Sequence, residues 1–132
     1  MAKESVTVTR KIETHKVNGL KEALTIEVYD EPGQGNACHE YGIVGPRNES
    51  ETTFPFCGIR FQNGPIQEVG VNGISNEALL AVVRDRLEGF QSGPYACWTN
   101  EQALKHVVSA MESLHLRTRE RVSRGVEGTH KV

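Results

Sequence analysis

The sequence predicts an α+β fold in which an N-terminal antiparallel β-sheet is followed by a C-terminal two-helix hairpin. Before residue 73, apolar and polar residues alternate in short runs, and this period of two is typical of half-buried strands. After residue 73, apolar residues recur at intervals of three and four, as in helices that pack along one face. A chain of 132 residues fits a single domain, with a strand-rich part (1–73) and a helical hairpin with a basic end (74–132).

The strand-rich part contains five runs that are rich in β-branched or aromatic residues and are bounded by turn residues. The expected strands are residues 5–14, 23–30, 39–44, 54–62 and 66–71. Between the last two, Asn63-Gly64-Pro65 predicts a tight hairpin turn, because Asn-Gly readily adopts positive φ angles. Residues 33–36 and 46–50 are typical of longer, looser connections.

The hairpin is predicted from helical periodicity and from residues that begin and end helices. Ser75 is a suitable N-cap for the first helix, and Gln91-Ser92-Gly93-Pro94 should end it. Thr99 to Gln102 matches a capping box for the second helix, which should continue to about Arg124 and be closed by Gly125. The expected apolar faces are Leu79, Leu80, Val83, Leu87 and Phe90 on the first helix, and Leu104, Val107, Val108, Met111, Leu114, Thr118 and Val122 on the second.

Composition limits the classes of function. The net charge of −2 argues against a protein that grips DNA over its whole surface, so any anion site must be local. Cys38, Cys57 and Cys97 are odd in number and widely spaced, which favours reduced thiols over a disulfide framework or a metal knuckle. With no signal-peptide pattern and no apolar run of about 20 residues, we expect a cytoplasmic protein that does not enter membranes.

Catalytic and metal-binding patterns are weak. The five histidines are scattered, and the sequence has no GxSxG, HExxH or P-loop pattern. Cys38 and His39 could be half of a metal site, but neighbours on a strand point to opposite faces. We therefore expect no enzyme, no metal and no cofactor.

Four arginines lie within eight residues near the C-terminus: Arg117, Arg119, Arg121 and Arg124. On a helical wheel, all but Arg119 fall together on the flank of the apolar stripe. Arg117 and Arg121 repel each other, and Arg121 has no acidic residue three or four positions away. A basic helix end that is favoured by the helix dipole explains the pattern. A socket for an external anion also explains it, because planar guanidinium forks suit a pyrophosphate.

From about residue 61 to residue 129, the chain resembles a helical hairpin that two groups of phage anti-defence proteins share. The resemblance rests on NGISNEALL, on the spacing of Phe90, Cys97 and Asn100, and on RTRERVSRGVEGT. The groups are the Thoeris anti-defence proteins of the first type and the anti-CBASS proteins of the second type. The strand-rich first half is more similar to the Thoeris group, although residues 1 to about 58 carry no recognised motif.

Proteins of these groups are not enzymes; they sequester nucleotide messengers of bacterial immunity in the host cytoplasm, during infection or from a prophage. In the Thoeris group the messenger is gcADPR, a cyclic isomer of ADP-ribose. The resemblance implies that Phe90 stacks on the adenine, that Asn100 hydrogen-bonds the ligand, and that Arg117 and Arg121 hold the pyrophosphate. Each residue also has a structural explanation: Phe90 continues the apolar series of its helix, and Asn100 lies in a first helical turn.

The expected ligand residues lie far apart on one helix. Asn100 and Arg117 are 17 residues apart, which is about 25 to 30 Å along a helix. One nucleotide does not bridge that distance, so two copies would have to pack their hairpins antiparallel and form two equivalent shared pockets. The resemblance further implies homodimers, or hexamers built as trimers of dimers.

The tail that begins at Gly125 is either a frayed terminus or part of a second site. The resemblance implies a pocket there for CBASS cyclic di- or trinucleotides, with Arg124 and Thr129 as candidates and Thr118 as a further one. Arg60, on the last long strand, could also face a phosphate, although such arginines commonly point to solvent. Two other functions stay open: a small regulatory DNA-binding protein that uses the arginine-rich helix end, and a partner-binding hairpin without a ligand.

Overall fold

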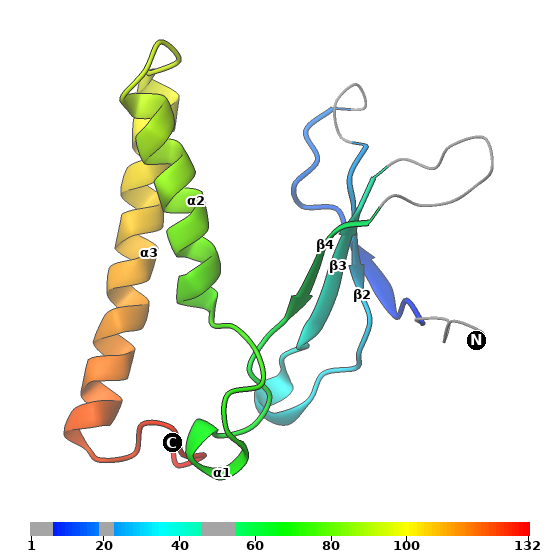
Figure 1. The fold of residues 1–132 in the computed structure, drawn as a ribbon, viewed down its shortest axis with the longest axis vertical. Coiled ribbons are helices and arrows are strands. Elements are labelled where there is room, and N and C mark those ends of the chain that lie inside the picture. Colours follow the sequence, from blue (N-terminus) through cyan, green and yellow to red (C-terminus); the bar gives the residue numbers. More distant parts are fainter. Residues whose placement is uncertain (1–6, 19–22, 46–54) are drawn as a thin grey trace. The chain divides into compact units, whose positions relative to one another are not determined.

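The computed structural model describes residues 7–18, 23–45 and 55–132, and its contacts divide the chain between Asn63 and Gly64 into two compact units. The described part of the first unit forms a four-stranded antiparallel sheet, and the second unit is helical (Figure 1). The predicted α+β fold is therefore confirmed. That both units act as one domain stays a prediction.

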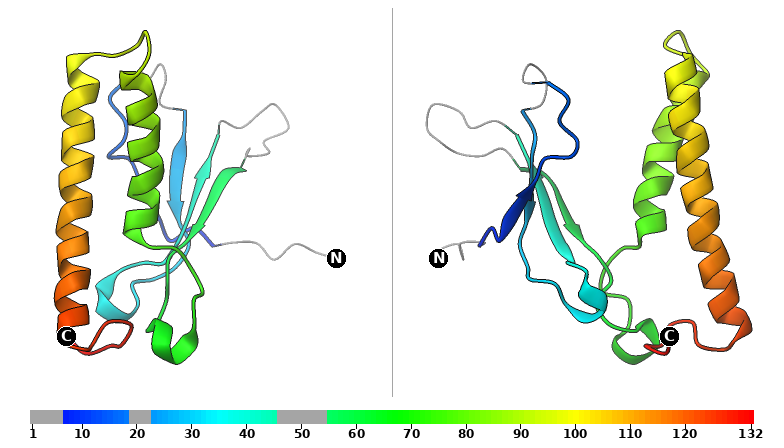
Figure 2. Two further views of the ribbon diagram at one scale, coloured as in Figure 1. Left: turned by 60° about the vertical axis from the view of Figure 1, so that its left-hand side comes forward. Right: turned by 180° about the vertical axis from the view of Figure 1, so that it is seen from behind.

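The sheet has the strand order β1-β2-β3-β4, and each strand is antiparallel to the next (Figure 2). The register places Thr25 opposite Val44 and Glu40 opposite Arg60. Four of the five predicted strands are confirmed in shortened form, although residues 5, 6 and 54 lie outside the described part. The strands are β1 (Arg10–Ile12), β2 (Thr25–Val28), β3 (Glu40–Val44) and β4 (Pro55–Arg60).

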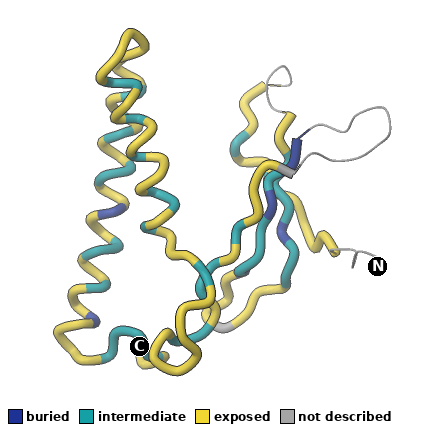
Figure 3. The backbone as a smooth tube through the Cα atoms, viewed as in Figure 1, coloured by how far each residue is buried: buried dark blue, intermediate teal, exposed yellow. Residues whose placement is uncertain are grey.

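The core of the sheet is small. Val28 is fully buried, and Cys38 and Val44 are each 6% exposed. Tyr41 and Phe61 add an edge-to-face contact with ring centroids 5.6 Å apart. Figure 3 shows that buried positions are few and scattered. The first unit therefore depends strongly on its hydrogen bonds as well as on burial.

The connection between β2 and β3 is closed by Asp30. Its carboxylate accepts hydrogen bonds from the backbone amides of His39 (2.8 Å) and Glu40 (3.1 Å). Between them lies the short 3-10 helix η1 (Gln34–Asn36), in which Gly35 has φ +78°. The predicted loose connection at 33–36 is thus held at both ends, whereas the one at 46–50 lies outside the described residues.

We expect Asp30→Asn to lower the free energy of unfolding of the first unit by about 1 kcal/mol at pH 7. Burial opposes ionisation of Asp30, but the amide hydrogen bonds outweigh it and lower its pKa below the ordinary 3.8. A folded-state pKa below the unfolded value stabilises the fold above the unfolded pKa, and that stability is lost as pH falls through the folded pKa. Denaturant titrations at pH 7 and pH 3 should therefore show that the free energy of unfolding decreases less on acidification in the variant than in the unaltered protein. An equal decrease in both proteins would contradict this role of Asp30.

The segment 66–71 is a helix and not the predicted fifth strand. It forms α1 (Ile66–Val69), so the predicted hairpin turn at Asn63-Gly64-Pro65 is also wrong. Gly64 does adopt a positive φ of 92°, but the Pro65 carbonyl then accepts the amides of Glu68 and Val69 and starts a helical turn. Proline lacks the N–H that a strand would donate and is favoured at helix starts, which explains the outcome.

The helical hairpin consists of α2 (Asn76–Gln91) and α3 (Trp98–Ser123), which lie side by side in opposite directions (Figure 1). The predicted cap is confirmed, because Ser75 Oγ accepts the Ala78 amide at 3.1 Å. The predicted end is confirmed too, since Arg124 is the C-cap and Gly125 has φ +72°.

The capping box at Thr99 to Gln102 is wrong. The N-cap of α3 is Cys97, so Thr99 already lies inside the helix. The Gln91 side chain fixes this start: its Nε2 donates to the Cys97 carbonyl and its Oε1 accepts the Cys97 amide, both at 3.1 Å. A contact from the preceding helix therefore overrides the local capping pattern.

The hairpin buries only part of its apolar surface. Met111 is 8% exposed, whereas other apolar residues of the two helices remain largely accessible. The exposed residues are Val82 (63%), Val83 (44%), Trp98 (73%), Leu116 (64%) and Val122 (60%). Of these, Val83 and Val122 were predicted for the apolar faces. In the described part of the chain, no helix has the length and apolarity to cross a membrane.

Candidate ligand-binding site

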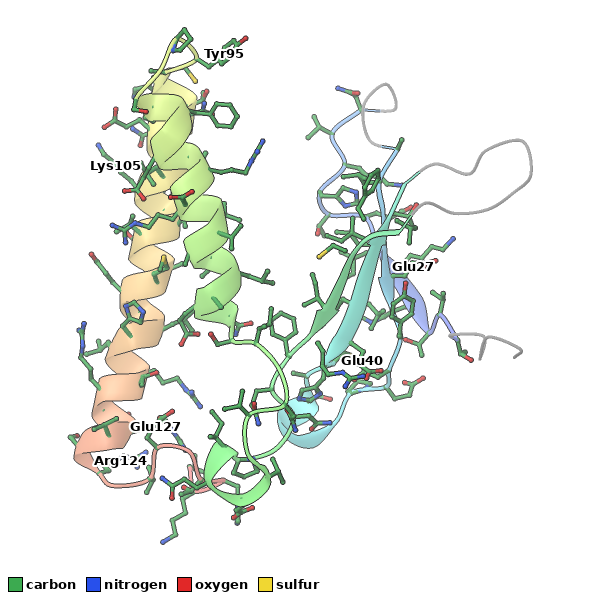
Figure 4. The ribbon with its side chains drawn as sticks, viewed as in Figure 1. Glu27, Glu40, Tyr95, Lys105, Arg124 and Glu127 are labelled. Atoms are coloured by element: carbon green, nitrogen blue, oxygen red, sulfur yellow. The ribbon has the colours of Figure 1, made fainter. Side chains whose placement is uncertain are left out.

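Phe90 and Asn100 lie on either side of the connection between α2 and α3. Phe90 is in the last turn of α2, Asn100 is in the first turn of α3, and both are half-buried. The Gln91–Cys97 hydrogen bonds described above tie the two helix ends together. The tip of the connection is marked by Tyr95 in Figure 4. The fold thus places an aromatic ring and a carboxamide at one end of the hairpin.

The Phe90 ring has two neighbours that the sequence did not reveal. The guanidinium carbon of Arg86 lies 5.1 Å from the ring centroid, which is cation–π geometry. The Tyr95 ring meets Phe90 edge-on, with centroids 6.4 Å apart and planes at 73°. Arg86 lies four residues before Phe90 on α2, so the i,i+4 spacing could have indicated this contact. Phe90 is therefore held at the helix end and is not simply a core residue.

An exposed thiol lies at the same end. The Cys97 pKa is lowered, first by a hydrogen bond with the Thr99 hydroxyl and then by the backbone amide of Asn100. The Cys97 sulfur and the Thr99 hydroxyl oxygen are 3.3 Å apart. A thiolate forms more readily when it accepts such hydrogen bonds.

At the other end of α3, Arg121 is buried to 9% exposure. Its Nε donates to the Glu127 carboxylate (3.2 Å), and its Nη1 donates to the Lys131 carbonyl (2.7 Å). Its Nη2 donates to the carbonyls of Val126 (3.0 Å) and Thr129 (2.9 Å). Four of the five guanidinium N–H donors are thus engaged by four residues between positions 126 and 131.

The C-terminal tail, residues 126–131, also contacts α1. The Gln67 amide donates to the Gly128 carbonyl (3.0 Å), and Gln67 Nε2 donates to the Glu127 carbonyl (2.7 Å). His130 Nδ1 lies 2.9 Å from the Glu68 carboxylate. Because Gly128 has φ +77° and a Cβ added there would lie 2.9 Å from Gln67 Cγ, other residues fit poorly there. The tail folds back on the helical unit, so the idea of a frayed terminus is wrong.

The other candidate arginines are exposed. Arg124 Nε pairs with Glu120 Oε1 at 2.6 Å, as the i,i+4 spacing allows. Arg117 is exposed, and within the described residues it has no carboxylate within 4.0 Å. Arg117, Arg121 and Arg124 fall on one flank of the apolar stripe on a helical wheel, but Arg121 is buried against the tail, whereas the other two are exposed.

The remaining candidates are Thr129, Thr118 and Arg60. Thr129 Oγ1 donates to the Val126 carbonyl at 2.5 Å and accepts the Lys131 amide at 3.3 Å, so its hydroxyl stabilises the turn of the tail. Thr118 is half-buried on α3. Arg60 lies on β4 in the other unit, where its 70% exposed side chain lies 3.4 Å from Glu40.

One copy of the chain does not bring the four main candidates together. Phe90 and Asn100 lie at the connected end of the hairpin, whereas Arg117 and Arg121 lie about 25 to 30 Å further along α3. Figure 4 shows this separation through Tyr95 at one end and Arg124 and Glu127 at the other. No group of three or more potential metal ligands occurs among the residues that the structure describes.

Residues 56–119 match the family model of the Acb2/Tad1 hairpin domain. The chain therefore contains a hairpin domain of the Acb2/Tad1 family. A similar protein, Thoeris anti-defense 1 from Bacillus phage SBSphiJ7, is 41% identical over an alignment of 91 residues that covers 66% of this chain. The aligned region spans 64% of the length of that relative. The resemblance inferred from the sequence motifs is therefore confirmed.

The Acb2/Tad1 match includes Phe90, Asn100 and Arg117 but stops before Arg121 and the tail. It also reaches back to Arg60 on β4. What sequence reasoning missed lies mostly around the tail: Gln67, Glu68 and Glu127 carry no recognisable signal. Glu127 is six residues from Arg121 and reaches it only because Gly125 reverses the chain.

Proposed function

We propose that this chain binds a cyclic ADP-ribose-type immune messenger, gcADPR, and sequesters it uncleaved in the host cytoplasm, so that Thoeris signalling is blocked. The relationship to a Thoeris anti-defence protein of a Bacillus phage supports the pathway. The choice of ligand is supported by the placement of an aromatic ring and a carboxamide at one end of the hairpin, with arginines at the other. These groups match the base, ribose and diphosphate of such a messenger.

The Phe90 end suits the nucleoside part of the ligand. An aromatic face that stacks on a purine contributes about 1–3 kcal/mol. Arg86 and Tyr95 hold the Phe90 ring, which reduces the freedom that the ring would lose on binding. The Asn100 amide offers both a donor and an acceptor for ribose hydroxyls or a base edge.

The arginine end suits the diphosphate. Arg117 is exposed and offers a planar fork that can donate two parallel hydrogen bonds to phosphate oxygens. Arg121 lies one helical turn further on, about 6 Å along the axis, so that two long side chains could converge on one diphosphate. Its donors are held by the tail in the unliganded chain.

A complete pocket requires two copies of the chain. If two hairpins pack antiparallel, Phe90 and Asn100 of one copy lie beside Arg117 and Arg121 of the other, and two equivalent pockets form. Exposed Val82, Trp98 and Leu116 supply apolar surface for such packing. A homodimer satisfies this requirement, and so does a hexamer that is built as a trimer of dimers.

Binding without cleavage fits the chemistry of these groups. A phenyl ring, a carboxamide and guanidinium groups bind and orient a ligand, but none of them is a general base or nucleophile near neutral pH. Because none of these groups attacks the ligand, a captured messenger should be released intact when the protein unfolds.

The test is a thermal-shift panel of gcADPR, other cyclic ADP-ribose isomers, ADP-ribose, and cyclic di- and trinucleotides. A ligand at 100 times its Kd should stabilise the folded state by about 2.7 kcal/mol. Chromatography of the supernatant after heating should recover the bound messenger unaltered. A converted product, or no shift with any cyclic ADP-ribose isomer, would refute the proposal. The cyclic oligonucleotides test the second pocket that we propose at Arg124 and Thr129.

The alternative function, DNA binding by the arginine-rich helix end, receives less support. Arg121 is buried and Arg124 is paired with Glu120, so the helix end offers a weaker cationic surface than its sequence suggests. A salt titration separates the two functions. DNA affinity should fall steeply with salt, whereas an enclosed nucleotide pocket should retain most of its affinity.

A further inference from the structure

We propose that the C-terminal tail, residues 126–131, is an internal competitor for Arg121. In the unliganded chain, tail oxygens occupy the donors that a diphosphate would take, so binding of the messenger and docking of the tail exclude each other. This inference rests on the function proposed above and adds a regulatory step to the same site.

The acceptors around Arg121 resemble those of a diphosphate. Three backbone carbonyl oxygens and one carboxylate oxygen lie 2.7–3.2 Å from the guanidinium nitrogens. Glu127 supplies the negative charge that a phosphate would bring. A guanidinium with one remaining N–H cannot form a bidentate pair. Arg121 can therefore hold a diphosphate only after the tail releases it.

The tail is attached by bonds that can be exchanged for water. Within the described part of the chain, its polar contacts outside α3 are the two Gln67 hydrogen bonds and the pair between His130 and Glu68, in which both side chains are at least half exposed. Its terminal Val132 is 99% exposed and anchors nothing. Segments with few buried apolar contacts and exposed hydrogen bonds open at low free-energy cost. The tail is thus a polar latch that can open without unfolding the hairpin.

Competition of this kind has a quantitative consequence. The apparent Kd of a ligand equals its intrinsic Kd divided by the fraction of molecules in the competent state. A latch that is closed in most molecules therefore weakens apparent binding, and a loosened latch strengthens it. If the tail were a part of the pocket, loosening it would do the opposite.

The experiment compares full-length chains whose latch is weakened without a change at Arg121. Gln67→Ala removes the bond to the Glu127 carbonyl without changing charge, and Glu127→Gln weakens the bond to Arg121 Nε. Calorimetric titration with gcADPR should give an apparent Kd about tenfold lower for the double variant than for the unaltered chain. Glu120→Gln is the matched control, because it removes a charge from the same helix end but no tail contact. We expect less than twofold change there.

A second measurement follows the tail directly. The Gln67 amide donates to the Gly128 carbonyl, so its hydrogen exchange reports whether the latch is closed. Saturating gcADPR should accelerate this exchange in the unaltered chain. Unchanged or weaker binding by the double variant, or slower exchange with ligand, would overturn the latch while leaving the proposed function intact. If neither gcADPR nor inorganic diphosphate binds any of these chains, both proposals fail together.

Discussion

An equal mixture of Phe90→Ala and Arg117→Ala protein, refolded together, should recover about a quarter of the normal gcADPR-binding capacity, although each variant binds poorly by itself. Loss of the stacking ring or of a charge-assisted phosphate pair should each weaken binding by about 10- to 100-fold. In a mixed dimer, one pocket receives intact Phe90 from one copy and intact Arg117 from the other, and the second pocket lacks both. On random pairing, half of the dimers are mixed, and each mixed dimer has one intact pocket out of two. A quarter of all pockets are therefore intact.

The reciprocal mixture supplies the control for this complementation. Unaltered protein that is refolded with an equal amount of the Phe90→Ala, Arg117→Ala double variant should lose capacity, because every pocket of a mixed dimer then lacks one group. Capacity per unaltered chain should fall by about half. A pocket within one chain would make both mixtures additive, and additivity in calorimetric titration would exclude shared pockets. The two mixtures move capacity in opposite directions, so partial misfolding of one variant cannot imitate the result.

Local sequence patterns predicted most of the fold because the apolar residues of each element follow its own period. Apolar residues alternate around Thr25–Val28 and recur at helical spacing after Ser75, and neither pattern depends on a contact from another segment. Prediction failed where a neighbour in space decided the outcome. The start of α3 is set by Gln91 from the preceding helix, and residues 66–71 follow the helical turn that begins at Pro65.

The residues of the candidate site could be proposed from the sequence, but the contacts that each of them makes could not. The spacing of Phe90, Cys97 and Asn100, together with two sequence motifs, indicated the family hairpin, and the structure places Phe90 and Asn100 at its connected end. Arg117 and Arg121 were indistinguishable on a helical wheel, since both seemed to be exposed cations one turn apart. Their difference arises from the chain reversal at Gly125, which brings Glu127 and three carbonyls onto Arg121 alone. Local spacing along a helix cannot register a contact made by a segment beyond its end.

Arg121→Ala should therefore lower the free energy of unfolding of the helical unit by about 2 kcal/mol, whereas Arg117→Ala should change it by less than about 0.5 kcal/mol. Arg121 is 9% exposed and satisfies three carbonyls and a carboxylate, and its removal leaves those acceptors to be solvated. Arg117 is exposed and should contribute mainly to ligand binding. Urea titrations of the two variants without ligand measure this difference.

Arg121→Lys refines the interpretation, because a lysine keeps the charge but cannot reproduce a fork that serves four acceptors. It should recover less than half of the stability that Arg121→Ala loses, and the Gln67 amide should exchange faster in both variants. Equal stability losses at positions 117 and 121 would mean that the tail contributes nothing to the folded state. A large loss confined to Arg121 would show that this arginine folds the chain in the absence of ligand. Arg121 could then bind the diphosphate only after the tail moves away. Arg117 needs no such movement, so the two arginines would bind in different ways although they lie one turn apart.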